Sequence, residues 1–455
     1  MRDIALFLIV AIGIPFILRN PAVGIAYWVW LSLMNPHRAT WGFAYSFQFA
    51  LVVAIATVIG TFLTKEPRQF KGGAVAWLLL AFLAWMCFTT IFALEPDRAV
   101  VMLERVVKIL FVTFLALFVL YKREHVMWLI LIIAVSIGFY GVKGGVYTIS
   151  GGGKGLVWGP PESFIADNNA LALAVIMTIP LLAYFYIMST RLWIRAAIAV
   201  SIALCAVCVF GSYSRGGFLA IVAMSAFLWI KAKRKLWLGV GVVLLGVGFY
   251  SFMPPAWEAR MNTISTYEQD SSALGRISTW TMLTNLALDR PLVGGGFEPY
   301  TDEVFRRYLP EYGRTHSAHS IYFQVLGEHG FVGLALFLTF WLLNWRLSRR
   351  IIKHTKSDPE AKWAYALAKM VQVSLIGYFV GGTFLNLAYW DMPYYLMIAL
   401  VVTWHVLRTQ SSSLTHPNAL QPDHQRLPYP ARSPPIPHRD DIITLAVRPD
   451  RRRSS

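Results

Sequence analysis

Apolar runs of roughly 20 residues recur along most of the chain, and this repetition limits what the chain can fold into. Of its 455 residues, 56% are hydrophobic and only 14% are charged. A water-soluble domain of this composition would expose large apolar patches to water. Helices that cross a lipid bilayer avoid this problem because lipid covers their apolar faces. The sequence therefore predicts an all-α, polytopic helical membrane protein.

Thirteen apolar segments are candidates for these helices. They cover residues 4–18, 23–34, 43–64, 73–93, 101–120, 126–148, 169–188, 193–213, 216–230, 236–253, 330–345, 364–385 and 392–407. The first of them has no small-residue cleavage site, so we expect it to be retained as a helix and not removed as a signal peptide.

Basic residues predict the orientation, because short basic loops stay on the cytoplasmic side of the membrane. The net charge of +17 lies mainly in such loops and in the C-terminal tail, which argues against a nucleic-acid-binding protein. The loops near 94–98, 150–168 and 386–391, and the long segment 254–329, alternate with the basic loops and are expected outside. The basic residues are Lys65, Arg68, Lys71, Lys122, Arg123, Arg191, Arg195, Lys231, Lys233, Arg234, Lys235, Arg346, Arg349, Arg350, Lys353, Lys356 and Lys362.

The first two apolar segments complicate the count of crossings. Segments 4–18 and 23–34 are shorter than the roughly 20 residues that a span needs, and Arg19-Asn20-Pro21 separates them. We expect the pair to make one net crossing. This gives about 12 crossings and places both termini in the cytoplasm.

The chain is expected to have four parts. Residues 1–253 form N-terminal transmembrane helices, 254–329 a large periplasmic catalytic loop, 330–408 C-terminal transmembrane helices, and 409–455 a disordered cytoplasmic tail. The loop is expected to be partly helical, with helices at Ser272–Asp289 and Glu303–Tyr308 and a third at His319–His329 that ends at Gly330. The tail is rich in Pro, Ser, Arg and His, and such a composition cannot pack a core.

Metal and nucleotide motifs are not found in the sequence. Cys87, Cys205 and Cys208 all lie in apolar runs, where free cysteine packs as a small apolar residue. His316 and His319 have no nearby pair of acidic ligands, which argues against zinc. The glycine runs lack the residues that complete a phosphate-binding or dinucleotide-binding motif. We expect no metal, no cofactor and no disulfide.

Arginines are the candidate ligands for a phosphate group. The long polar segment has six arginines and no lysine, and guanidinium offers paired donors to phosphate oxygens. Arg276 lies near the start of a predicted helix, where backbone N–H groups also favour an anion. Arg215 lies between two apolar runs on the same side, where a charge is costly and suggests function. The structural alternatives are ion pairing for the arginines of the segment and turn capping for Arg215.

Other charged residues are secondary candidates for the same site. They lie in the polar segment or near the outer ends of apolar runs, and they are Lys108, Lys143, Arg290, Arg314 and Asp167. For Lys108 the alternative is an ion pair with Glu104 one helical turn away.

His319 is the candidate catalytic base. It comes just before an apolar run, and neutral imidazole can accept a proton from a hydroxyl group near pH 7. The alternative is a structural histidine that is hydrogen-bonded at the membrane interface.

Taken together, these residues resemble the O-antigen ligase and polymerase superfamily of bacterial envelope glycosyltransferases. The resemblance lies in the order of its motifs and covers about residues 1–408. The motifs are Ser214-Arg215-Gly216-Gly217, Gly275-Arg276 with Trp280, Pro291 with Gly294–Gly296, and His319-Ser320 with Glu328 and Gly330. Pro160–Asn169 resembles another family signature, and Asn35-Pro36-His37-Arg38 resembles an O-glycosylation ligase subgroup.

The resemblance implies a glycosyltransferase of the bacterial inner membrane with its active site facing the periplasm. Its donor would be O-antigen on undecaprenyl pyrophosphate, and its acceptor a sugar hydroxyl of lipid A–core in lipopolysaccharide biosynthesis. We expect Arg215 and Arg276 to bind the pyrophosphate and His319 to act as the base, without a metal, in a direct displacement that inverts the anomeric carbon.

Three other functions remain open on the sequence alone. A protein O-oligosaccharyltransferase and an O-antigen polymerase belong to the same superfamily and share the donor. A lipid or glycan transporter is a different class, but the sequence shows none of the internal repeats that many transporters have.

Overall fold

The computed structural model describes residues 1–415, apart from residues 68, 233–234, 265–267, 269 and 312–313. Met1–Arg408 form one compact unit. Several predictions concern residues outside the described part: the basic residues Arg68, Lys233 and Arg234, and most of the expected tail, residues 416–455.

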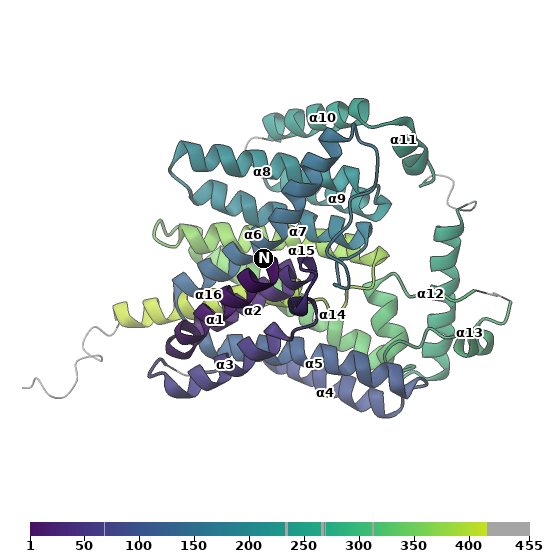
Figure 1. Cartoon of the computed structure of the whole chain (residues 1–455), viewed down its shortest axis with the longest axis horizontal. Coiled ribbons are helices and arrows are strands. Elements are labelled where there is room, and N and C mark those ends of the chain that lie inside the picture. Colours follow the sequence, from purple (N-terminus) through teal and green to yellow (C-terminus); the bar gives the residue numbers. More distant parts are fainter. Residues whose placement is uncertain (68, 233–234, 265–267, 269, 312–313, 416–455) are drawn as a thin grey trace, which may run out of the picture. The chain divides into compact units, whose positions relative to one another are not determined.

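Helices make up most of the described residues, which contain no strand (Figure 1). Every apolar segment expected from the sequence contains a helix. The helices are α1 (Arg2–Arg19), α2 (Pro21–Met34), α3 (Phe49–Leu63), α4 (Gly73–Ile91), α5 (Pro96–Val119), α6 (Arg123–Ser150), α7 (Asn168–Met188), α8 (Leu192–Gly211), α9 (Arg215–Lys231), α10 (Lys235–Phe252), α11 (Pro255–Asn262), α12 (Ser271–Asp289), α13 (Asp302–Tyr308), α14 (Ile321–Thr355), α15 (Lys362–Gly381) and α16 (Asp391–Thr415), with short 3-10 helices η1 (Pro36–Ala39), η2 (Phe43–Tyr45) and η4 (Gly382–Phe384).

Six helices of the described part are long and apolar enough to cross a membrane, or seven if α10 and α11 form one bent span. The six are α4, α6, α7, α8, α14 and α15 with η4. The apolar helices α2 and α3 have only 14 and 15 residues. The chain is therefore a multi-pass helical membrane protein, and a total of about 12 crossings stays a prediction.

Three of the segments that were expected on the outer side make contacts with one another or with the segment after α2. Tyr45 donates a hydrogen bond to Glu162 at 2.9 Å, and the backbone N–H of Leu94 donates to the carbonyl of Gly295 at 2.8 Å. These contacts join the segment after α2, the loop before α7, the loop after α4 and the segment after α12. Which side of a membrane these segments face stays a prediction.

The N-terminus differs from the expectation. α1 and α2 are continuous helices joined at Asn20, and they contact each other and α3. Arg2 donates to the carbonyl of Ala39 at 3.2 Å, and Asp3 accepts from the backbone N–H of Gly42 at 2.9 Å. The two helices therefore form a hairpin and do not make one net crossing. The first residues of α1 therefore lie beside η1 and η2, because Arg2 and Asp3 bond to the segment that follows α2.

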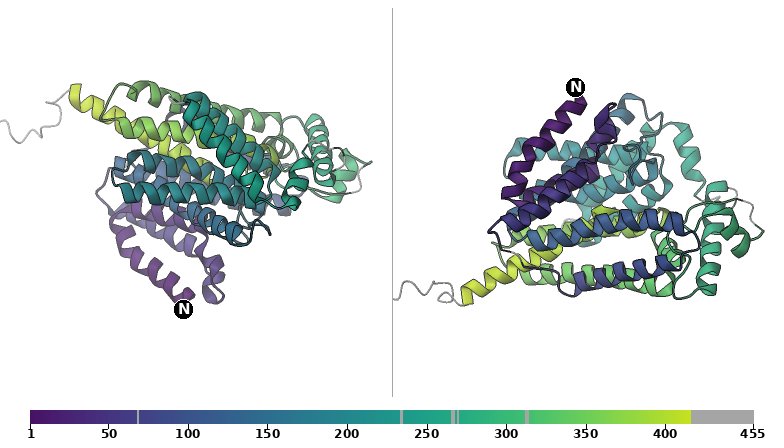
Figure 2. Two further views of the ribbon diagram at one scale, coloured as in Figure 1. Left: turned by 90° about the horizontal axis from the view of Figure 1, so that it is seen from above. Right: turned by 60° about the horizontal axis from the view of Figure 1, so that its bottom comes forward.

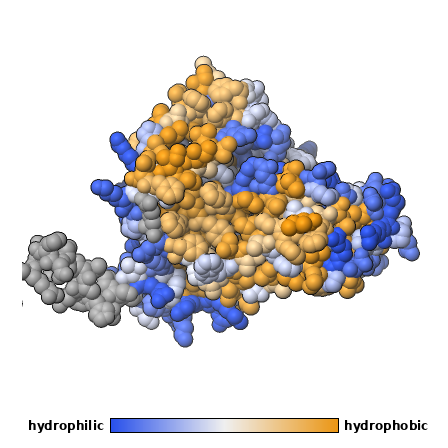
Figure 3. All heavy atoms as spheres, turned by 90° about the horizontal axis from the view of Figure 1, so that it is seen from below, coloured by the Kyte–Doolittle hydropathy of each residue, from blue (hydrophilic) through white to orange (hydrophobic). Residues whose placement is uncertain are grey.

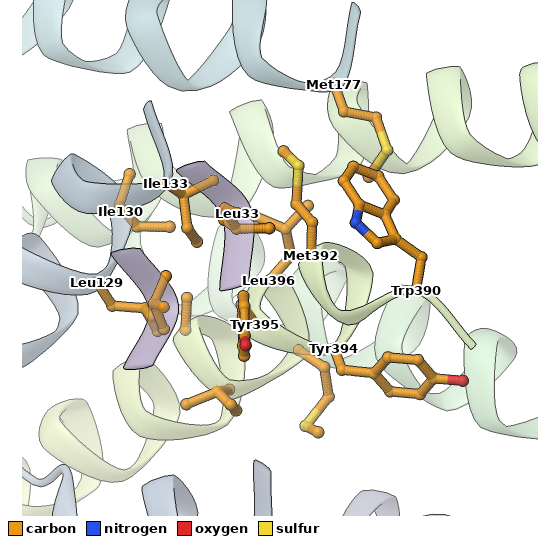
Figure 4. Packing of buried hydrophobic residues seen from close by; sticks show 14 of the residues in the cluster. Leu33, Leu129, Ile130, Ile133, Met177, Trp390, Met392, Tyr394, Tyr395 and Leu396 are labelled. Atoms are coloured by element: carbon orange, nitrogen blue, oxygen red, sulfur yellow. The ribbon is translucent and has the colours of Figure 1, made fainter. Parts of the chain in front are cut away.

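The main core lies where α2, α6, α7 and α16 meet (Figure 4). Buried residues lie on all sides of α7, so this helix is enclosed by protein. Its neighbours are α6, α8, α9 and α15. Figure 4 shows Leu33, Ile130 and Met177 around the aromatic residues Tyr395 and Trp390. This enclosed centre fixes the ends of α7 and α9, from which part of the candidate site is built.

The polar segment before α14 packs at one end of the helices. α12 and α13 lie beyond that end in Figures 1 and 2, and α12 crosses it. Their own small core includes Met282, Leu286, Val304 and Phe305. The expected helices of this segment are present as Ser271–Asp289 and Asp302–Tyr308.

α14 contains a sharp kink at Gly330, where φ is 68° and ψ is −171°. The expected helix break at this residue is confirmed, although the helix begins at Ile321 and not at His319. The kink separates a short helix next to the polar segment from the long apolar helix that follows.

Candidate functional site

Arg215 is the first residue of α9, and the turn before it is closely fixed. Ser214 caps the helix by accepting a hydrogen bond from the N–H of Gly217 at 3.0 Å. Asn168, at the start of α7, donates to the carbonyl of Ser212 at 2.7 Å. The beginnings of α7 and α9 therefore hold Arg215 in a defined place at the outer end of the core.

The guanidinium of Arg215 joins α9 to the beginning of α12. It contacts the carboxylate of Asp270 at 2.9 and 2.8 Å and the hydroxyl of Thr263 at 2.7 Å. Asp270 also caps α12 by accepting from the N–H of Ala273 at 2.8 Å. The hydrogen bond from Arg215 lowers the pKa of Asp270 below its ordinary value, so the pair stays charged at neutral pH.

Arg276 lies one and a half turns into α12, and its Nε is buried without a hydrogen-bond partner. Burial lowers the pKa of this guanidinium, and the neighbouring positive charges of Arg215 and Arg260 lower it further. The negative charges of Asp270 and Asp167 only partly offset this. A buried donor beside two other cations is costly unless an anion binds there. Arg276 is thus a suitable ligand for a phosphate group.

His319 lies in the same cluster. The segment before it is held by Trp280 of α12, which donates to the carbonyl of Ala318 at 2.7 Å and stacks on Phe323 of α14 at 4.9 Å. Burial lowers the pKa of His319, and the charge of Arg276 lowers it further, whereas Asp167 raises it. The imidazole is therefore neutral at pH 7 and able to accept a proton. Its backbone has the positive φ of 43°.

Asp167 is the secondary candidate that the structure brings to this cluster. It is the N-cap of α7, and its carboxylate accepts from the N–H groups of Asn169 and Ala170 at 2.9 and 3.1 Å. Its charge acts on both Arg276 and His319. Capping therefore accounts for its position, and its charge contributes to the field at the site.

The other secondary candidates lie elsewhere or only near the site. Arg290 is 14 residues along α12 from Arg276, or about 21 Å, and it donates to the carbonyl of Phe92. Lys108 pairs with Glu104 on the exposed surface of α5. Lys143 is exposed on α6, and Arg314 is exposed in the segment that leads to His319.

No group of three or more histidine, cysteine, aspartate or glutamate side chains is arranged to hold a metal within the described part of the chain. What gathers at the site is an excess of positive charge beside a neutral imidazole. Such an arrangement can bind an anionic leaving group and accept a proton.

Comparison with known sequence families agrees with this geometry. Residues 200–338 match the family described as O-antigen ligase. This match supports a place in the O-antigen ligase and polymerase superfamily. Residues 1–190 match a second family, whose function is unknown. A comparison with curated proteins gave no match.

The O-antigen ligase match contains Arg215, Arg276 and His319, and it indicates an enzyme of the glycosyltransferase kind with a ligase-type or polymerase-type function. Asp167, by contrast, lies in the family of unknown function. The two matched regions therefore meet at the candidate site.

The glycine-rich segment of the O-antigen ligase region is structural. The N–H groups of Gly295 and Gly296 donate to the carbonyls of Gly327 and Glu328 at 2.8 and 2.9 Å. A Cβ added at Gly294 would lie 2.6 Å from the carbonyl oxygen of Gly327. This close backbone approach requires glycine and fixes the polar segment against the first turns of α14.

Glu328 completes this attachment from inside the protein. Its buried carboxylate accepts hydrogen bonds from Tyr300 at 3.1 Å and Tyr389 at 2.6 Å. Tyr300 belongs to the polar segment, and Tyr389 comes just before α16. Glu328 therefore connects three separate parts of the chain behind the site.

Sequence reasoning did not single out Asp270, Thr263 and Arg260. Asp270 is one of several acidic residues in the polar segment. Its place just before Ser271-Ser272 is a helix-capping signal, and it could have indicated the position of the carboxylate. Nothing in the sequence indicates that Arg215, 55 residues away, is its partner.

Proposed function

We propose that this protein is an O-antigen ligase. It transfers O-antigen from undecaprenyl pyrophosphate to a sugar hydroxyl of lipid A–core, at the periplasmic face of the inner membrane. The observation that carries the proposal is the buried Nε of Arg276, which has no partner and lies in a cluster with two other arginines and a neutral histidine. A diphosphate would supply the missing negative charge.

The two arginines have different tasks in this proposal. Arg276 binds the diphosphate directly through its free donor. Arg215 keeps its bond to Asp270, and because guanidinium has five N–H donors, it can also face a phosphate oxygen. Both charges stabilise the negative charge that develops on the leaving diphosphate.

His319 would act on the acceptor. Its imidazole removes the proton from the sugar hydroxyl while the hydroxyl oxygen attacks the anomeric carbon. The bond from that carbon to the diphosphate oxygen breaks, and undecaprenyl pyrophosphate leaves with the electron pair. A single displacement of this kind inverts the configuration of the anomeric carbon.

Reconstitution in lipid vesicles tests this function. The purified protein is given undecaprenyl-pyrophosphate-linked glycan together with lipid A–core, a protein acceptor, or more of the donor. We expect transfer to lipid A–core only. Transfer to protein would indicate an O-oligosaccharyltransferase, and growth of the donor glycan would indicate a polymerase.

The His319→Ala variant separates binding from chemistry. We expect its turnover rate to fall by about 10²–10⁴-fold, the typical contribution of a general base. It should still bind the donor through Arg276. Unchanged turnover would remove His319 from the mechanism. Loss of donor binding would instead make His319 a ligand or structural residue.

A further inference from the structure

A pocket lies in the N-terminal region of unknown function, outside the O-antigen ligase match. It has a volume of about 580 Å³ and is lined by residues of α2, η1, η2, α3 and α5. α2 contacts both α3 and α5. Figure 3 views the protein from the side on which α3, α4 and α5 lie in Figure 1, and shows a broad hydrophobic surface there.

The long wall of this pocket is one apolar face of α3. Leu51, Ile55 and Ile59 follow at intervals of four residues, and each is about half exposed. They extend over about 12 Å of the helix. On the other side of the same helix, Val53 and Ala56 are buried in the protein. The exposed face is thus apolar, continuous and open along its length.

The end of the pocket is polar and carries positive charge. His37, Arg38, Tyr45 and Gln48 line it from the segment between α2 and α3. Lys108 of α5 is a second cation among the residues that line the pocket. None of the residues that line the pocket is acidic. The apolar wall therefore leads to a basic end on the side where the outer loops meet.

The ion pairs of Arg38 and Lys108 leave both side chains able to bind a further anion. Arg38 contacts Glu162 at 2.7 Å and lies over the ring of Tyr45 at 4.7 Å, but its Nε is buried without a hydrogen-bond partner. The partner of Lys108, Glu104, is 63% exposed. Exposed ion pairs are weak and exchange readily with another anion.

We propose that this pocket binds one anionic phospholipid of the bilayer, with an acyl chain along α3 and the phosphate at Arg38 and Lys108. The apolar wall of the pocket matches an acyl chain, and its basic end matches an anionic headgroup. A water-soluble phosphate would not contact the apolar wall, and a neutral lipid would leave the buried Nε of Arg38 without a hydrogen-bond partner. This site is independent of the proposed transfer reaction.

Photocrosslinking in vesicles tests the proposal. The full chain is reconstituted in phosphatidylcholine vesicles that contain a small fraction of phosphatidylglycerol with a photoreactive acyl chain. We expect the label on the exposed face of α3 and on Phe111 of α5. Phosphatidylcholine with the same photoreactive acyl chain should label this face at least roughly fivefold less, since each basic residue near a membrane surface strengthens the binding of anionic lipid by about that factor.

Two variants locate the site. Arg38→Gln with Lys108→Gln should remove the preference for phosphatidylglycerol, and Ile55→Trp should fill the pocket and prevent labelling by either lipid. Leu342→Trp, at an exposed position of α14, is the matched control and should change nothing. Melting temperatures show that each variant is folded.

Three results would overturn the proposal. One is equal labelling by the two headgroups. Another is labelling spread evenly over exposed helices such as α10 and α14. The third is competition by glycerol phosphate in solution, which would indicate a site for soluble phosphate and not for a lipid.

Discussion

The arginines of the site differ in how far they are already paired. Arg215 has its charge matched by Asp270, whereas Arg276 is buried with a free Nε. The sequence predicts both as phosphate ligands and cannot distinguish them, because pairing depends on a carboxylate that is remote in the chain. In the folded protein, a bound anion would therefore stabilise Arg276 more than Arg215.

Arg276→Ala is therefore expected to reduce turnover by about 10²–10³-fold, as the loss of one charge-stabilising donor often does. Arg276→Lys should restore only part of this, because an ammonium group cannot reproduce paired hydrogen bonds. Steady-state kinetics of glycan transfer in vesicles measures both. Arg306→Ala, exposed on α13, is the control and should keep nearly full activity; equal losses at the two positions would show that Arg276 has no special role.

The pH dependence of transfer should follow His319. Because burial and Arg276 lower its pKa, the imidazole stays neutral at pH values somewhat below about 6.5, the ordinary pKa of histidine. The rate should be constant from mildly alkaline pH down to that value and fall only at lower pH, where the base becomes protonated. Asp167→Asn removes a charge that raises this pKa, so the acidic fall should move to lower pH. A fall that begins above pH 6.5, or does not move in the variant, would contradict this assignment.

At the scale of elements, the polar segment is held to α14 by backbone contacts that need glycine. Gly330 has a backbone conformation that is almost restricted to glycine, and the N–H of Phe331 donates to the carbonyl of Pro291 at 2.8 Å. The sequence predicts a break at Gly330 and a turn at Gly294–Gly296. It does not predict that the two meet, because hydrogen bonds between distant segments have no local pattern.

Gly330→Ala should destabilise the protein by about 1–3 kcal/mol through backbone strain alone. The new Cβ would also lie 2.4 Å from the carbonyl oxygen of Leu292. Thermal unfolding of the purified protein measures the loss. Gly138→Ala is the matched control, because nothing lies within 4 Å of a Cβ there, and alanine should stabilise that helix by about 0.5–1 kcal/mol. Equal melting temperatures for the two variants would argue against the proposed strain.

For the whole molecule, the sequence predicts a helix in every apolar segment because apolarity and length are local properties. The side on which the chain begins could not be predicted. It depends on whether the short helices α1 and α2 form a hairpin, and the contact of Asp3 with Gly42 decides that. Likewise, the sequence indicates Arg215, Arg276 and His319 singly, but only the folded chain brings them together.

Labelling of single cysteines with a membrane-impermeant reagent tests the orientation. In a Cys87→Ala background, which leaves only the buried Cys205 and Cys208, Glu311→Cys and Arg2→Cys should react from outside, and Arg350→Cys only after the membrane is opened. The basic loops set this direction, and the hairpin places residue 2 with the outer loops. Reaction of position 350 from outside would reverse the whole orientation, and protection of position 2 alone would argue against the hairpin.

The hairpin of α1 and α2 also has a consequence for how the chain is made. With the polar segment outside, Arg2 and Asp3 must be exported through the bilayer before α2 returns to the same side. A reporter domain fused ahead of Met1 would have to be exported with them while the rest of the chain is still being synthesised. A reporter that folds only in the cytoplasm would then block insertion at the first step of biogenesis.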